Sequence, residues 1–176
     1  MDSLKGKIYV TLVLNVVLYG CECWTMKQSL LKKLESFHRR CVRRMCRTTT
    51  LAMHSQHIHH TDLYKRLGIH SLDHYYHTRV LRWAGHVTRM PMSRRPRLFL
   101  TSGLLNHPQN GRMKDWGATV TGALKAKKIP HAYEQWRVLA RDRDDWRERI
   151  KKTPEELEQE EVENGPPPLR DAAYYQ

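Results

Sequence analysis

Cysteine and acidic residues are both scarce in this chain of 176 residues, and each shortage excludes a class of protein. Four cysteines are too few for a disulfide scaffold, and they favour a reduced, intracellular protein. Only 18 acidic side chains stand against 31 basic ones, which leaves a net charge of +13. This balance excludes an acidic solvating segment and argues against an ordinary balanced metabolic enzyme. It favours a polyanionic partner, either nucleic acid or an anionic membrane surface.

Catalytic signatures are also missing. The sequence contains no G-x-x-x-x-G-K-[ST] loop, no G-x-S-x-G elbow and no H-E-x-x-H pair. The only adjacent aspartates, Asp144 and Asp145, lie in the stretch RDRDDWRER, which is typical of a salt-bridged surface helix. No carboxylate set supports two-metal chemistry, so we assign no catalytic residue and no metal ligand.

Long hydrophobic runs are represented by a single stretch, residues 8–20 (IYVTLVLNVVLYG). Two lysines before it and Cys21 after it resemble a secretory signal peptide. Asn15 in the middle, the bulky Tyr19 and the lack of an A-x-A-like cleavage site argue against that interpretation. The run is also too short to cross a bilayer, which takes about 20 residues. We therefore expect a buried first helix and no membrane partner.

The acidic residues are concentrated at one end of the chain. Residues 153–176 hold seven carboxylates and one arginine, whereas residues 1–152 hold 30 basic and 11 acidic side chains. Three consecutive prolines near this acidic end predict a mobile tail. Prolines and glycines between residues 91 and 113 predict a subdomain boundary. We expect a thumb-like helical region at 1–92, a C-terminal helical segment at 93–152 and a disordered tail at 153–176.

Hydrophobic periodicity predicts helices throughout and no strand ladder, so the expected fold is all-α, a small helical bundle followed by a helical segment and the tail. The predicted helices cover about Leu4–Tyr19, Gln28–Arg47, a short helix capped by Thr61 and ending at Gly68, Leu72–Met90, Lys114–Lys127 and Ala132–Lys151. The predicted connections are an extended link at Gly20–Met26 and loops at 48–60 and 91–113.

The helix predicted at Gln28–Arg47 is strongly amphipathic. One arc, expected to be core, holds Leu30, Leu31, Leu34, Phe37, Cys41, Val42 and Met45. The opposite arc holds Lys32, Lys33, Arg39, Arg40, Arg43, Arg44 and Arg47. Charge runs are usually solvated surface, but Glu35 is the only acid in this helix, and a cationic face without acids repels itself. We therefore expect the seven cations to contact nucleic-acid phosphates.

A second basic stripe lies on the helix predicted at Leu72–Met90. It consists of Arg79, Arg82, His86 and Arg89. It adjoins an apolar face formed by Leu72, Tyr76, Val80, Trp83, Val87 and Met90. Two interpretations stand side by side: either the stripe contacts nucleic acid, or Trp83 and Gly85 pack the bundle while the arginines pair with local acids.

Cysteines and histidines raise the question of a metal site. Cys21, Cys23, Cys41 and Cys46 suggest zinc together with His38, but Cys21 and Cys23 are spaced more tightly than usual zinc ligands. Cys41 falls on the predicted core arc, where a free cysteine acts as a small hydrophobe. A loose group of histidines is interpreted as surface loop, with metal binding or charging in mild acid as the alternative. Its members are His54, His57, His59, His60, His70, His74 and His77.

Three segments, in this order, resemble one protein family. They are VLYGCECW with the following LLKKLESFHRRCVRRM, then LRWAGHVTRM, and finally Trp136, Leu139, Ala140, Asp142, Arg143 and Trp146. Over about residues 4–150 their order and spacing are similar to the C-terminal part of a non-LTR (LINE-type) retrotransposon reverse transcriptase. The sequence departs from the complete enzyme, because it contains no palm [YF]-x-D-D motif and no recognisable endonuclease domain or zinc-knuckle pattern.

The resemblance implies a place within a larger enzyme, as the helical thumb and the segment beyond it. A thumb packs beside the product duplex and holds template and primer in register. The implied partners are RNA and DNA, as an RNA–DNA hybrid, and the missing upstream polymerase domains; the implied location is nuclear or cytoplasmic. We expect no cofactor in this chain, because Mg²⁺ belongs to the missing palm, and no polymerase activity from the chain alone. The alternative is a stand-alone, domesticated nucleic-acid-binding or scaffold protein.

Overall fold

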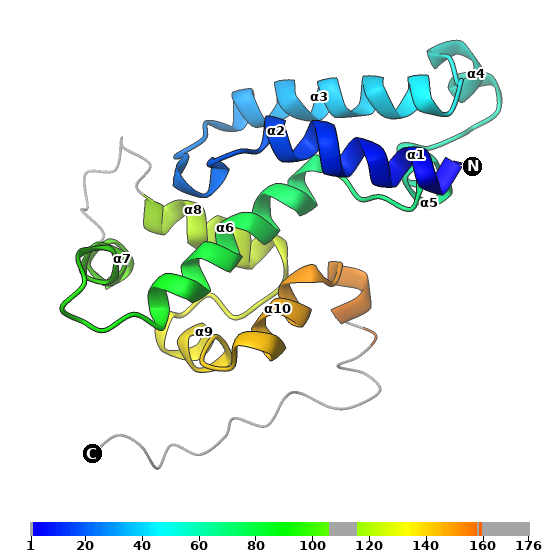
Figure 1. Cartoon of the computed structure of the whole chain (residues 1–176). Helices are drawn as coiled ribbons and strands as arrows, with labels where there is room; N and C mark the ends of the chain where they lie inside the picture. Colours follow the sequence, from blue (N-terminus) through cyan, green and yellow to red (C-terminus); the bar gives the residue numbers. More distant parts are fainter. Residues whose placement is uncertain (1, 106–115, 158, 160–176) are drawn as a thin grey trace.

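Every regular element that the structure describes is a helix. The computed structural model describes residues 2–105, 116–157 and 159, and within them the all-α expectation is confirmed (Figure 1). In chain order the elements are α1 (Asp2–Ile8), the π-helix η1 (Tyr9–Leu14), α2 (Asn15–Val17), the short 3₁₀-helix η2 (Cys21–Cys23), α3 (Gln28–Met45), α4 (Thr50–Ser55), α5 (His60–Leu67), α6 (Leu72–Thr88), α7 (Arg95–Leu105), α8 (Trp116–Ala126), α9 (Tyr133–Leu139) and α10 (Arg143–Lys151).

The hydrophobic run near the N-terminus forms one continuous helical path through α1, η1 and α2. Leu14 and Leu18 are buried on its inner face. The outer face is exposed, so the expectation of a buried first helix holds for one side only. The exposed apolar residues of this segment are Leu4, Ile8, Leu12, Val13, Val16 and Tyr19. Among the described residues, no helix combines the length and apolar character that crossing a membrane requires.

Helix α6 runs through the middle of the molecule and organises the packing (Figure 1). It contacts η2, α3, α7, α8 and α10. Leu72, Tyr76, Val80 and Val87 are buried as predicted, whereas Trp83 lies at the border between core and solvent. Because Leu81 and Ala84 are buried as well, α6 carries core contacts on more than one face.

The stretch 48–60 is not the simple loop predicted from its threonines and histidines. It contains α4, whose first turn is capped by Thr49, since the Thr49 hydroxyl accepts the backbone N–H of Ala52 at 3.1 Å. The next helix begins at His60 after the N-cap residue His59, so the predicted cap at Thr61 is wrong. The predicted end at Gly68 is confirmed, and its φ of 63° is the left-handed conformation that glycine adopts readily.

The stretch 91–113 also contains a helix where a loop was predicted. Helix α7 begins at Arg95, and Pro96 lies in its first turn, where a missing N–H costs little. The buried guanidinium of Arg97 ties α7 back to α6 by donating to the carbonyl of Thr88. The later part of the predicted loop, residues 106–113, lies outside the described residues, as does the predicted helix start at Lys114.

The helix predicted at Ala132–Lys151 is two helices, α9 and α10. Asp142 caps the second, because its carboxylate accepts the backbone N–H groups of Asp144 and Asp145 at 2.8 and 3.0 Å. Both tryptophans are fully buried and stack with their ring centroids 6.0 Å apart, so Trp136 of α9 and Trp146 of α10 hold the two helices together. The break at Asp142 turns α10 back against α6.

The acidic segment begins with helical residues at 154–157. The Thr153 hydroxyl accepts the backbone N–H of Glu156 at 3.3 Å, and the Glu156 carboxylate accepts that of Thr153 at 2.7 Å. This reciprocal pair is a capping box, which fixes the start of the turn. The remainder of the predicted tail, residues 160–176, lies outside the described residues.

Candidate nucleic-acid interface

Helix α3 presents the predicted row of cations to solvent. Lys32, Lys33, Arg39, Arg40, Arg44 and Arg47 are exposed, and Arg43 is half-buried. The helix has 18 residues, and its part of the row, from Lys32 to Arg44, extends for about 18 Å at about 1.5 Å per residue; Arg47 lies just beyond the end of the helix at Met45. Arg43 donates to the Nε2 atom of His60 at 3.3 Å, so part of its guanidinium is already engaged within the protein.

The buried face of α3 differs from the predicted arc. The buried residues are Leu31, Glu35, His38 and Val42, and the predicted core residues Leu30 and Phe37 are exposed. The prediction failed because it assigned only apolar residues to the core. Each of the two buried polar side chains finds hydrogen-bond partners on other elements, so burial leaves neither of them unsatisfied.

Glu35, the only acid of α3, points into the fold. One carboxylate oxygen accepts the Tyr64 hydroxyl at 2.9 Å and the Arg39 guanidinium at 3.1 Å. The other accepts the backbone N–H of Leu72 at 3.1 Å, at the start of α6, where a helix favours negative charge. The carboxylate of Glu35 therefore points into the fold and reaches only Arg39 among the cations of the row, so the others have no acid of α3 beside them.

His38 is fully buried next to Glu35 and serves the packing of α3. Its Nε2 donates to the carbonyl of His70 at 3.0 Å, so its Nδ1 accepts the hydroxyl of Tyr9 at 3.0 Å. Burial lowers the pKa of His38, which favours the neutral ring that these two hydrogen bonds require. All four cysteines are free, and no group of three potential metal ligands occurs among the described residues. His38 therefore acts as a structural residue in this arrangement.

A groove of about 850 Å³ lies along α6 and α10, beside the place where the two helices pack together. It contains the whole predicted stripe of α6 and adds cations from α10. The basic residues that line it are Arg79, Arg82, His86, Arg89, Arg143, Arg147 and Lys151, with His70 and His74 at one end. Glu22 is the only carboxylate among the lining residues. The groove therefore concentrates positive charge between two walls of the protein.

The four residues of the α6 stripe have different environments. Arg79 donates to the carbonyl of Leu18 at 3.2 Å and to the side chain of Asn15, so it fastens the N-terminal segment to α6. Arg89 donates to the carbonyl of Ala140. Arg82 and His86 are exposed. Arg79 and Arg89 therefore hold the fold, through carbonyl and amide oxygens rather than through the local acids that one interpretation expected, whereas Arg82 and His86 face solvent in the groove.

The basic face of α10 was not predicted from the sequence, although the spacing of its cations has a helical period. Arg143, Arg147 and Lys151 follow one another at intervals of four residues, so they share one side of a helix. Arg147 pairs with Asp144 at 3.5 Å, but its own positive charge stays close to that of Arg89. Burial lowers the pKa of Arg89, and Arg143 and Arg147 lower it further. This repulsion shows that cations of both walls lie within electrostatic reach of each other.

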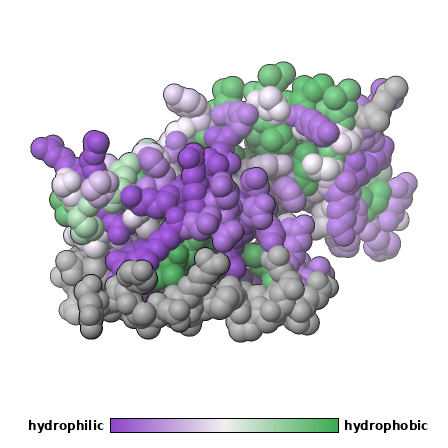
Figure 2. Space-filling view, turned by 60° about the horizontal axis from the view of Figure 1, so that its bottom comes forward, coloured by the Kyte–Doolittle hydropathy of each residue, from purple (hydrophilic) through white to green (hydrophobic). Residues whose placement is uncertain are grey.

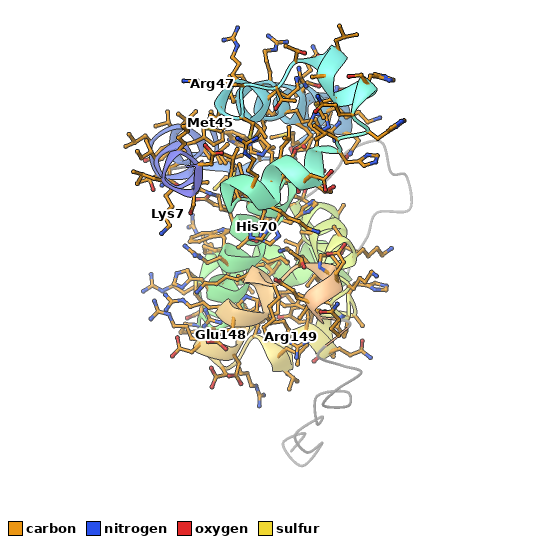
Figure 3. The ribbon with its side chains drawn as sticks, turned by 90° about the vertical axis from the view of Figure 1, so that its right-hand side faces the viewer. Lys7, Met45, Arg47, His70, Glu148 and Arg149 are labelled. Carbon is orange, nitrogen blue, oxygen red and sulfur yellow. The ribbon has the colours of Figure 1, made fainter. Side chains whose placement is uncertain are left out.

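The two basic surfaces lie in different parts of the molecule. Helix α3 lies at the top of Figure 1 and α10 near the bottom, and in the side view Arg47 is at the upper end and Arg149 at the lower end (Figure 3). A broad hydrophilic surface covers the middle of the face in Figure 2, and hydrophobic residues gather at its upper part. The α3 row and the groove are thus separate candidate sites.

The histidines form two groups rather than one. His54, His57, His59 and His60 lie around a small pocket beside α4, whereas His70, His74 and His77 belong to the start of α6 and its approach. In the second group His70 and His74 stack with ring centroids 4.2 Å apart.

A buried lysine adjoins the second group. The ammonium of Lys127 donates to Nδ1 of His74 and to the carbonyl of Lys152, both at 3.0 Å. Burial lowers the pKa of Lys127 to about 8. Burial and the nearby Lys127 charge lower the pKa of His74 to about 3 and that of His77 to about 4. Both histidines are therefore neutral in the native protein at pH 7.

Comparison of the chain with protein-family models, with curated proteins and with solved structures finds no match. The resemblance to a retrotransposon reverse transcriptase therefore stays an expectation from the sequence.

Proposed function

We propose that this chain binds a nucleic-acid duplex, foremost an RNA–DNA hybrid, along the outer face of α3, as the thumb-like region of a non-LTR reverse transcriptase. Its role is to hold template and primer for polymerase domains that lie outside this chain. The sequence holds no palm [YF]-x-D-D motif, so the chain contributes binding and not nucleotide transfer.

The inward orientation of Glu35 is the observation that carries this proposal. A surface helix usually balances its cations with acids three or four residues away. In α3 the one acid, Glu35, is buried against Tyr64 and Leu72 and pairs on its own helix only with Arg39, so the other cations of the row have no acid of α3 to balance them. A row of unbalanced cations weakens the fold by self-repulsion, and an anionic partner removes that repulsion.

The geometry of the row suits a phosphate backbone. Lys33, Arg40 and Arg44 lie on one line opposite the buried face, at intervals of seven and four residues, and the exposed Arg47 follows just beyond the end of the helix at Met45. Lys33 and Arg44 are about 16 Å apart along the helix at about 1.5 Å per residue. One strand of a duplex places a phosphate about every 3.4 Å along the axis, so the row meets several phosphates. Such contacts bind without sequence preference and weaken as salt rises.

Charge reversal on this line tests the proposal. The variant Lys33→Glu/Arg40→Glu/Arg44→Glu changes three exposed side chains that have no hydrogen bond or ion pair with another described side chain. It leaves Arg39 on Glu35 and Arg43 on His60. We expect it to bind a fluorescent RNA–DNA hybrid about tenfold or more weakly than the parent in moderate salt.

A control with the same change of charge separates local contact from net charge. Lys7→Glu/Arg95→Glu/Lys125→Glu reverses exposed cations on α1, α7 and α8. We expect this control to keep most of the affinity. If the two triple variants bind the hybrid equally well, the α3 row is not the duplex site.

A further inference from the structure

The groove between α6 and α10 holds cations that have no side-chain partner in the part of the chain that the structure describes. Arg82 is on the α6 wall, and Arg143 and Lys151 are on the α10 wall. All three are exposed, and none makes a hydrogen bond or ion pair with another side chain in the described part of the chain. Three free cations facing one hollow favour an anionic ligand that touches both walls.

The same groove contains an aromatic platform. Trp83 is half-buried and lines the groove between Arg82 and Arg89. Its ring centroid lies 5.3 Å from that of His86, one helical turn further along α6. Trp146 also lines the groove and is fixed, because its indole N–H donates to the carbonyl of Leu81 at 3.0 Å. A partly exposed tryptophan held among cations is the arrangement that stacks a nucleobase and neutralises its flanking phosphates.

A duplex cannot use this platform. In a duplex both faces of every internal base are covered by its neighbours, whereas an unpaired strand presents its bases freely to aromatic side chains. The groove is also of the size that takes a short ligand, since small-molecule sites typically enclose roughly 300–1,000 Å³. The exposed row on α3 is by contrast open and long, so it suits the outside of a duplex.

We propose that the groove between α6 and α10 is a second nucleic-acid site, which binds an unpaired segment of RNA or DNA by stacking a base on Trp83 and pairing adjacent phosphates with Arg82, Arg143 and Lys151. The inference rests on the proposed function in that it takes the ligand to be nucleic acid. It goes beyond that function because it assigns a different form of nucleic acid to a different surface. The chain would then hold a duplex and a single strand at the same time.

Short homopolymers test this assignment on the full chain. The probes are fluorescein-labelled oligouridylate and oligothymidylate of eight nucleotides, which form no duplex, and the RNA–DNA hybrid. The variants are Trp83→Leu, Trp83→Phe and the double variant Arg82→Gln/Lys151→Gln. The matched control is Arg95→Gln/Lys125→Gln, which removes two exposed cations outside the groove.

We expect Trp83→Leu to weaken binding of the oligonucleotides by about 5- to 100-fold, the range for loss of one stacked base. Trp83→Phe should retain part of the affinity, because a smaller ring still stacks. Arg82→Gln/Lys151→Gln should weaken oligonucleotide binding, and the control should bind the oligonucleotides as the parent does. Binding of the hybrid should change little in all four.

Tryptophan fluorescence gives a direct signature of stacking. Oligothymidylate should quench part of the emission of the parent chain, and this quenching should be missing in Trp83→Phe. Oligoglutamate should neither quench this emission nor displace the oligonucleotide efficiently. If it does both, the groove is a site for acidic peptides and the proposal is wrong.

The design separates failure of this inference from failure of the proposed function. Oligonucleotide binding that survives in both groove variants overturns the groove site and leaves the α3 row untouched. Oligonucleotide binding that is lost in the α3 triple variant but kept in the groove variants also overturns it. If Trp83→Leu unfolds, the exposed double variant decides the question. Loss of hybrid binding in the α3 variant alone, with oligonucleotide binding kept, supports both sites.

Discussion

Gly85 of α6 and Trp146 of α10 are in direct contact, with the indole ring lying against the glycine α-carbon. A Cβ atom placed on Gly85 would overlap Nε1 of the ring and lie 2.6 Å from its Cδ1. The same indole N–H donates to the carbonyl of Leu81, one turn earlier on α6. Both residues belong to the segments that resemble the reverse transcriptase family. Their shared role here is structural, because this contact sets α10 against α6 and so forms the groove.

The contact predicts the effect of one methyl group. Gly85→Ala should destabilise the protein by about 1–3 kcal/mol, because the ring must shift and weaken its hydrogen bond to Leu81. Gly122→Ala is the matched control, since Gly122 lies on α8 with open space around its α-carbon. Alanine there should stabilise the protein by about 0.5–1 kcal/mol through helix propensity. Urea denaturation measures both. Equal stabilities of parent and Gly85→Ala would show that the contact is not tight.

The sequence was enough to predict the helices and the cations of α3, but not the residues that α3 buries. Charge and helical period are local properties, so the outer row could be predicted from residues 28–47 alone. The burial of Glu35 and His38 depends on Tyr64, His70 and Leu72, which arrive from distant positions. Without those partners, polar side chains are correctly expected outside.

The buried carboxylate of Glu35 supports a second prediction. Glu35→Ala leaves the Tyr64 hydroxyl and the backbone N–H of Leu72 without their acceptor inside the fold. We expect a loss of about 3 kcal/mol or more in the free energy of unfolding, because buried unsatisfied donors are costly. Glu35→Gln keeps the size and one acceptor oxygen, so it should lose less. Chemical denaturation at pH 7 measures the difference, and two variants as stable as the parent would contradict the assigned contacts.

Stability should fall in mild acid because of His74 and His77. Their native pKa values of about 3 and about 4 lie below the unfolded value of 6.5. Above pH 6.5 both states carry neutral histidines, and the full stability is present. As pH falls from 6.5 toward 4, the unfolded chain gains protons that the native chain does not. The loss is at most about 1.4 kcal/mol per pH unit for each histidine.

Thermal melts between pH 7 and pH 5 check this slope, since most carboxylates stay ionised in that range. The double variant His74→Gln/His77→Gln should show a flatter dependence than the parent. His131→Gln, which changes an exposed histidine, should keep the slope of the parent. A parent chain whose stability is constant from pH 7 to pH 5 would show that both rings are already able to charge in the fold.

The groove shows where prediction from sequence stopped. The α6 stripe could be predicted, because Arg79, Arg82, His86 and Arg89 follow a helical period. The other wall of the groove, α10, could not be predicted. The single long helix expected at 132–151 gives no reason for residues 143–151 to face α6. The cap at Asp142 breaks that helix, and Trp146 then docks on Gly85. A glycine and a tryptophan far apart in sequence, each unremarkable alone, decide which side of α10 faces α6.

The salt dependence of hybrid binding tests the central claim most directly. The measurement is the association constant of the full chain for an RNA–DNA hybrid over a series of salt concentrations. If Lys33, Arg40, Arg44 and the adjacent Arg47 together neutralise about four phosphates, log K should fall against log salt with a slope of about −3 to −4. In Lys33→Glu/Arg40→Glu/Arg44→Glu the slope should shrink by about one for each cation removed. A slope near zero in the parent, or an unchanged slope in the variant, would contradict duplex binding by α3.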